Sequence, residues 1–131
     1  MNRSEIWRDV NDALRRAMNE GLHLLDEGDL VEQSDRLLLN LPIVGGTQPT
    51  TALLLRRYYP QLHQELCLGN RPRLQFTGLE EELRELTRGV IVTILSEEGI
   101  SVENAVLLAL VLHKRGLATL CAMPPAAPTT I

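Results

Sequence analysis

The stretch AVLLALVLHK, residues 105–114, constrains the fold more than any other part of this chain. Eight apolar residues stand in a row, from Ala105 to Leu112, and a basic cluster follows them. A helix that buries a single stripe keeps polar residues on its opposite face, so a helix that is apolar all round must be covered on every side. The cover can be the protein's own interior, a second copy of the chain, or lipid.

Lipid is the least suitable cover. A membrane-spanning helix needs about 20 predominantly apolar residues, and this stretch offers eight between Asn104 and His113. Residues 1–20 carry charges throughout and contain no apolar segment typical of a secretory signal. We therefore expect no membrane contact and a cytoplasmic location, with Cys67 and Cys121 as reduced, buried thiols.

Leucine dominates the apolar composition and favours an all-α fold. The chain has 131 residues, of which 26 are Leu and only four are aromatic. Leucine is a strong helix former, whereas strands draw on β-branched and aromatic residues. A chain of this length is one domain by the usual scaling. We expect a single helical domain over 1–123 and a flexible Pro-rich tail over 124–131.

Apolar periodicity and helix breakers predict a compact bundle of about five helices. The first should end in DEGD, residues 26–29, with Gly28 in the left-handed position after it and Asp29 capping the next. Three points stay open. Pro60 either kinks one helix or separates two, residues 90–95 admit a strand as the minority reading, and residues 117–121 form a helical turn or a short strand. The expected helices cover residues 5–27, 29–40, 51–69, 79–98 and 102–115.

The last two expected helices carry more apolar surface than a small bundle needs if each helix buries one stripe. We therefore expect a protein that acts through protein–protein contacts, as a self-associating protein, an adaptor or a small subunit of a larger assembly. A twofold homodimer is the default symmetry. The expected contact residues are Val90, Ile94, Val106 and Leu110.

One basic and aromatic concentration offers an alternative function. Arginine forks beside aromatic rings suit single-stranded nucleic acid, so a helical small subunit of a ribonucleoprotein that binds RNA or single-stranded DNA is the second hypothesis. The net charge of −4 gives it no general support. The candidate residues are Arg56, Arg57, Tyr58, Arg71 and Arg73.

Arg57 and His63 stand five residues apart, a spacing that resembles the Arg-x4–6-His motif of a family of small helical ribonucleases. The resemblance covers seven residues and implies a helical nuclease using His63 as a second alternative. The chain departs from the family where Tyr58 follows the arginine, since the family has a polar residue there, and where Pro60 interrupts the helix.

Other catalytic and cofactor signatures are missing from the sequence. His63 and Cys67, at i and i+4, could place two zinc ligands on one helix face, but His113 and Cys121 do not form a second close pair. No set of nucleophile, general base and oxyanion donors can be assembled. We expect no metal and no cofactor, and a binding or assembly role rather than an enzyme.

Overall fold

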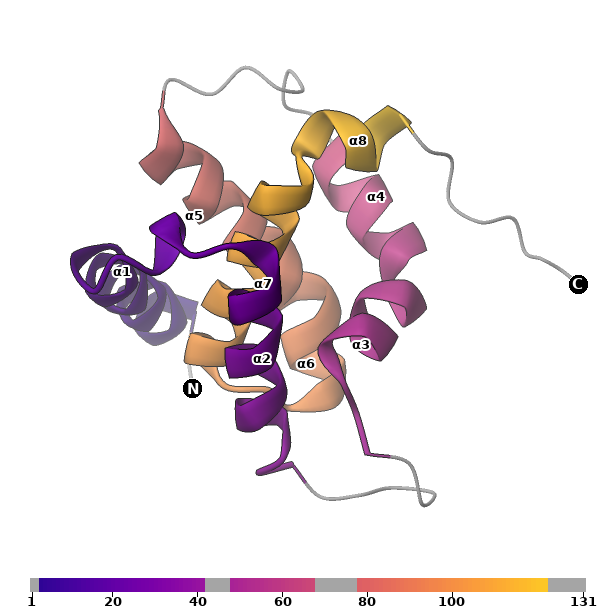
Figure 1. The fold of residues 1–131 in the computed structure, drawn as a ribbon, viewed down its shortest axis with the longest axis horizontal. Helices are drawn as coiled ribbons and strands as arrows, with labels where there is room; N and C mark the ends of the chain where they lie inside the picture. Colours follow the sequence, from indigo (N-terminus) through magenta and orange to yellow (C-terminus); the bar gives the residue numbers. More distant parts are fainter. Residues whose placement is uncertain (1–2, 42–47, 68–77, 123–131) are drawn as a thin grey trace, which may run out of the picture.

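The computed structural model describes residues 3–41, 48–67 and 78–122, and these residues form helices and no strand (Figure 1). The all-α prediction is confirmed. The expected number of five helices is too low. The helix that begins at Thr51 ends before Pro60 and a new one follows, and a further short helix comes after Gly116. The elements are α1 (Arg3–Asn19), η1 (Leu22–Leu24), α2 (Glu27–Leu38), α3 (Thr51–Arg57), α4 (Tyr59–Cys67), α5 (Leu79–Val90), η2 (Ile91–Leu95), α6 (Ser96–Glu98), α7 (Val102–Arg115) and α8 (Leu117–Ala122).

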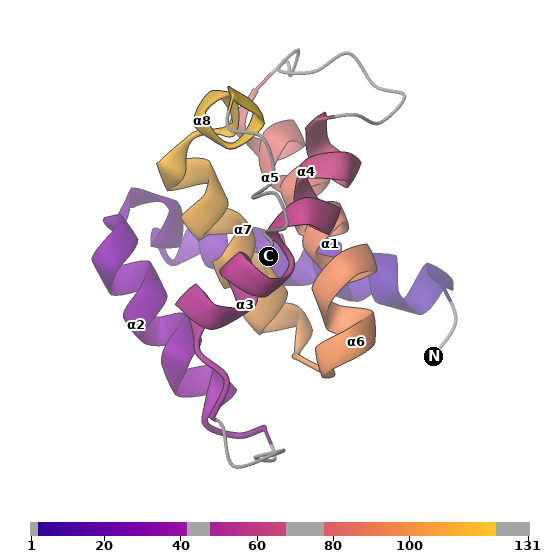
Figure 2. The same cartoon turned by 90° about the vertical axis from the view of Figure 1, so that its right-hand side faces the viewer.

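Helix α7 is the centre of the bundle, and its bounds are those expected from the sequence. The Ser101 side chain caps its first turn by accepting the Asn104 N–H at 3.0 Å. No residue from Asn104 to Leu112 exposes more than 5% of its surface. Figures 1 and 2 show α7 in the middle, with α1, α2 and α5 packed around it. The apolar stretch is thus covered by the protein's own interior.

The four expected contact residues lie in this same interior. Val90 and Ile94 are fully buried, and Val106 and Leu110 expose 2% and 1% of their surface. The surplus of apolar surface inferred for residues 79–98 and 102–115 is absent because α1 and α2 cover α7 as well as α5 does. In this conformation these four side chains pack in the core of the single chain and expose little surface.

Polar pairs join the surface of α7 to each of the three helices around it. The two more exposed pairs, each between an arginine and a glutamate, contribute about 0 to 1 kcal/mol each, and all three pairs help to fix how the helices are rotated against one another. They are Arg16–Glu103 with α1 at 3.2 Å, Arg115–Glu27 with α2 at 3.0 Å, and His113–Glu82 with α5 at 2.6 Å.

A buried polar cluster ties α2, α3 and α7 together. Ser34 is fully buried, and its Oγ accepts one hydrogen bond from Thr51 Oγ1 at 2.7 Å and another from Asn104 Nδ2 at 2.8 Å. The backbone N–H of Thr51 donates to Asp35 Oδ1 at 2.7 Å. Buried polar groups are costly without partners, so this cluster specifies how the start of α3 sits on α2 and α7.

The boundary between α1 and α2 differs from the expectation. Helix α1 ends at Asn19, and Gly21 takes the left-handed conformation with φ at +74°. Gly28 lies inside α2, whose cap is Asp26, since its side chain accepts the Asp29 N–H at 2.8 Å. The prediction of Gly28 as terminator and Asp29 as cap was wrong, because Gly21 and Asp26 supply these signals earlier in the chain.

Pro60 separates two helices. Helix α3 ends at Arg57, and Pro60 lies in the first turn of α4, where its missing N–H would have no helical partner in any case. Leu62 N–H donates to Tyr58 O at 2.9 Å and so starts the new helix. Of the two possibilities left open for residues 51–69, the structure has the separate helices α3 and α4, and residues 68 and 69 lie outside the described part of the chain.

Residues 79–98 are helical throughout, but the helix widens at η2, which is π-helical. The strand considered for residues 90–95 is absent. Gly99, with φ at +71°, ends the helix, as the sequence indicates. Within the described residues, no helix combines the length and apolar character needed to cross a membrane. The tail predicted for 124–131 lies outside the described residues.

Candidate binding groove and the predicted site residues

The basic and aromatic cluster is occupied by a carboxylate. Glu98 Oε2 accepts a hydrogen bond from Tyr58 Oη at 2.5 Å and one from Arg57 Nη1 at 3.0 Å. Tyr58 exposes only 9% of its surface and presents no free ring for a base to stack on. Its assignment as a stacking residue is corrected. Arg56 is exposed, whereas Arg71 and Arg73 lie outside the described residues.

The environment of Tyr58 also changes its ionisation. Burial, followed by the hydrogen bond and the negative charge of Glu98, raises the pKa of Tyr58 from 10.0 to about 12. Burial likewise raises the pKa of Tyr59. Both phenols are therefore neutral hydrogen-bond donors over the physiological range and offer no base for catalysis.

His63 lies inside the molecule, and no acidic partner for it is recorded among the residues that the structure describes. It exposes 7% of its surface, and its ring centroid is 6.1 Å from that of Tyr59. Its Nδ1 atom is buried and has no hydrogen-bond partner within the described structure. Arg57, the other residue of the ribonuclease-like spacing, is engaged by Glu98. Among the described residues, no side chain is hydrogen-bonded to His63 Nδ1 in the way that would orient a general base.

Cys67 and Cys121 form a disulfide, with their Cα atoms 5.5 Å apart. The prediction of two reduced thiols is thereby corrected. Spacing along the chain gave no sign of the pairing, because 54 positions separate the two residues. Disulfides are rare in reducing compartments, so the cysteines no longer support the cytoplasmic location. Across the residues that the structure describes, no group of three or more His, Cys, Asp or Glu side chains could hold a metal ion.

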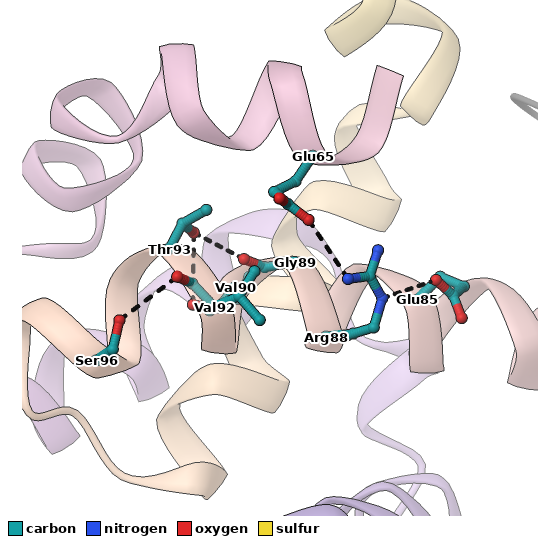
Figure 3. A network of polar contacts seen from close by, with 8 residues as sticks. All are labelled: Glu65, Glu85, Arg88, Gly89, Val90, Val92, Thr93 and Ser96. Atoms are coloured by element: carbon teal, nitrogen blue, oxygen red, sulfur yellow. Dashed lines mark hydrogen bonds and ion pairs between the residues drawn. The ribbon is translucent and has the colours of Figure 1, made fainter. Parts of the chain in front are cut away.

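The seam between α4 and α5 is close-packed and polar at its edge (Figure 3). A Cβ atom on Gly89 would lie 2.9 Å from Leu66 Cδ2, so the glycine allows α4 to approach. Arg88 reaches Glu65 on α4 at 3.4 Å and Glu85 on its own helix at 3.0 Å.

The π-helical segment η2 begins at the same seam. Thr93 Oγ1 donates to the carbonyl oxygen of Gly89 at 2.7 Å, which satisfies an acceptor where the regular hydrogen-bond ladder changes (Figure 3). Such segments occur often at functional sites. Here Val92 and Thr93 line a polar hollow of about 520 Å³ together with Gln61, Gln64 and Glu97. The hollow lacks the apolar floor that small-molecule sites require.

A second hollow has that apolar floor. A groove of about 370 Å³ lies between α1 and α2 and crosses α7, and we call it the α1–α2 groove. Ala13 and Ala17, one turn apart on α1, have short side chains and so leave room for the groove. Helix α7 forms its base. The apolar lining is Ala13, Ala17, Leu22, Leu37, Val106 and Leu107.

Charged side chains of both signs surround the α1–α2 groove. Arg16 and Arg36 line it together with Glu20 and Glu103. Arg16 and Glu103 pair with each other and each expose 59% of the side chain, so their pairing is readily exchanged. Two positive and two negative residues at one rim give a surface that can be complementary to itself.

Two leucines, one before the first residue of α2 and one after its last, are largely exposed to solvent. Leu24, before the helix, exposes 76% of its surface, and Leu39, after it, exposes 66%. Among the described residues, only Val92 is a further exposed large hydrophobic side chain, at 45%. Along the chain, Leu24 lies two positions after Leu22 and Leu39 two positions after Leu37, and both Leu22 and Leu37 line the α1–α2 groove.

Sequence patterns missed this groove because its residues come from four elements. Ala13 and Ala17 fit the buried stripe of α1, and Leu37 fits that of α2, so each alone reads as core. The one signal available was the run of three leucines at 37–39, which a single buried stripe of a helix cannot cover. Comparison of the chain with protein-family models, curated proteins and solved structures finds no match.

Proposed function

We propose that this chain acts through protein–protein contacts and associates with a second copy of itself through the α1–α2 groove. The observation that carries the proposal is the apolar lining of the α1–α2 groove, together with two exposed leucines, Leu24 and Leu39, in the segments that also supply Leu22 and Leu37 to that lining. Single exposed leucines are common on protein surfaces, whereas an apolar groove whose own segments also expose leucines supports a contact surface.

A second copy fits better than an unrelated partner because of the charges at the rim. In a twofold contact the same surface meets itself, so residue i of one protomer faces residue j of the other, and the reverse. A rim with two arginines and two glutamates can then place each arginine opposite a glutamate. A rim of one sign would repel its copy and require an oppositely charged partner.

The energy of the contact comes from the leucines. Full burial of one leucine side chain stabilises a contact by about 1.5 to 3 kcal/mol, before the cost of ordering is subtracted. The charged pairs contribute little because they are exposed, and they fix register instead. Loss of both leucines should therefore weaken association by at least about a hundred-fold.

Light scattering after size-exclusion chromatography tests the proposal. The wild type is expected to show a concentration-dependent mass between that of one chain and two, and Leu24→Glu with Leu39→Glu should yield a monomer. Val92→Glu is the matched control, because it places the same charge on an exposed apolar position beside the polar hollow at η2. A wild type that stays monomeric at high concentration contradicts the proposal, and so does a Val92→Glu variant that dissociates equally.

A further inference from the structure

Helix α8 is attached to α4 by two contacts that the sequence does not reveal. The Cys67–Cys121 disulfide joins the two helices, and Tyr59 Oη donates to the carbonyl oxygen of Leu120 at 2.8 Å. The chain enters α8 through Gly116, whose φ of +94° favours glycine. Six residues are too few for a helix to be stable alone, so α8 depends on its attachment.

The two cysteines of the disulfide differ in their exposure. Cys67 exposes 1% of its surface, whereas Cys121 is partly exposed. Thiol–disulfide exchange begins with attack of a thiolate on the more accessible sulfur, and the other cysteine leaves. The structure thus allows attack at Cys121, with Cys67 as the leaving group.

A buried ring nitrogen without a partner lies on the same helix face as this leaving group. His63 precedes Cys67 by four residues, so both side chains project from the same buried face of α4. The Nδ1 atom of His63 is buried and lacks a hydrogen-bond partner within the described structure. A buried polar atom without a partner is costly. A thiol formed at Cys67 would supply that atom with a donor, which the disulfide cannot do.

We propose that the Cys67–Cys121 disulfide is a site of reversible exchange with a dithiol reductant, and that its reduction releases α8 from α4. One thiolate of the dithiol attacks Cys121 Sγ, the S–S bond breaks, and Cys67 leaves as a thiolate that takes up a proton. The second thiolate of the reductant then attacks its own sulfur in the mixed disulfide, and Cys121 leaves and is protonated. The protein gains two electrons and two protons, and the dithiol becomes a disulfide.

Release of α8 need not disturb the rest of the core. The central residues 104–112 of α7 are enclosed mainly by α1, α2 and α5, which the disulfide does not join. Reduction would uncover the face of α4 that carries Tyr59, His63 and Cys67. Figure 1 shows α4 and α8 on the side of the molecule away from α1, so this exchange site is separate from the contact proposed above.

Thiol counting and hydrogen exchange on the full chain test the inference. The oxidised protein is expected to show no free thiol, and dithiothreitol without denaturant should produce two. Amides of 117–122 should then lose protection while those of 104–112 keep theirs, and reoxidation should restore the first state. The double variant Cys67→Ser with Cys121→Ser cannot form the disulfide and is the reference for the state in which α8 is released. Reductant should leave its hydrogen-exchange pattern unchanged.

The role of His63 is tested by a redox titration against reduced and oxidised dithiothreitol. His63→Leu removes the acceptor and keeps an apolar side chain of similar bulk, so the equilibrium should move about five-fold towards the disulfide. Tyr59→Phe is the matched control on the same face, and it should loosen α8 without that shift. The inference is overturned if reduction requires denaturant, if 104–112 lose protection together with 117–122, or if the purified oxidised protein contains free thiols.

Discussion

Tyr58 and Glu98, 40 positions apart, share a hydrogen bond of 2.5 Å that joins the C-terminal end of α3 to α6. A hydrogen bond to a charged group contributes about 1.5 to 3 kcal/mol. Tyr58→Phe should therefore lower the free energy of unfolding by about that amount at neutral pH. Urea unfolding followed by circular dichroism measures it, and an unchanged midpoint would show that the bond is not formed in solution.

The same residue predicts a dependence on alkaline pH. Because the pKa of Tyr58 rises from 10.0 to about 12 in the folded chain, the unfolded chain loses this proton first. The contribution of Tyr58 to stability is complete below pH 10 and decreases as the pH rises from 10 towards 12. Wild type should lose more stability over this interval than Tyr58→Phe, in which only Tyr59 still titrates with a raised pKa. Equal losses in the two proteins would contradict the assignment.

The close approach of Gly89 to Leu66 predicts a coupled pair of substitutions. Gly89→Val should cost about 1 to 3 kcal/mol, since a Cβ at this position lies 2.9 Å from Leu66 Cδ2. Leu66→Ala makes room, so the double variant should be more stable than the sum of the single losses predicts. A thermal-unfolding double-mutant cycle measures the coupling. Strict additivity would place the two helices farther apart than the structure does.

The buried cluster around Ser34 predicts an unusual order of stabilities. Ser34→Ala leaves Thr51 Oγ1 and Asn104 Nδ2 buried without their acceptor, at a cost of about 1 to 3 kcal/mol for each unsatisfied group. A triple variant that combines Ser34→Ala with Thr51→Val and Asn104→Leu removes all three polar groups, so it should recover part of that loss. Chemical unfolding measures the free energy of unfolding of the two variants. A triple variant less stable than Ser34→Ala would refute the reasoning.

The nucleic-acid hypothesis predicts binding that the geometry does not favour. Glu98 neutralises Arg57, and Tyr58 is buried, so single-stranded RNA or DNA should show no retention in filter binding at low salt. Retention that weakens with salt and with Arg56→Ala would revive that hypothesis.

The nuclease hypothesis is tested with His63→Ala. Any ribonuclease activity of the purified protein should be the same in this variant as in the wild type, because His63 is buried and has no acidic partner in the described structure.

Sequence patterns predicted the helices well where local signals are strong. Ser101 and Gly116 mark the two ends of α7. The eight consecutive apolar residues between them indicate a helix that is buried on all sides. The end of α1 was misplaced because Gly21 and Gly28 carry the same local signal, and only packing selects Gly21. The β-branched residues at 90–95 weakened the helical pattern without showing that the helix widens there.

Contacts between distant residues lay beyond the sequence. The disulfide, the Tyr58–Glu98 bond and the groove each join elements whose spacing along the chain carries no signal. Val90, Ile94, Val106 and Leu110 were chosen for their apolar character, which is the property that also places a residue in a core. Whether such a residue lies in the core or at a contact surface depends on how α1 and α2 pack over α7, which the sequence does not show.

Hydrogen exchange measured at low and at high protein concentration tests the central claim, that two copies meet at the α1–α2 groove. We predict that amides in residues 13–24 and 33–39 exchange more slowly at high concentration, while those in 79–98 are unchanged. The Leu24→Glu, Leu39→Glu variant should lose this concentration dependence. Exchange that is independent of concentration, or new protection confined to 79–98, would contradict the account.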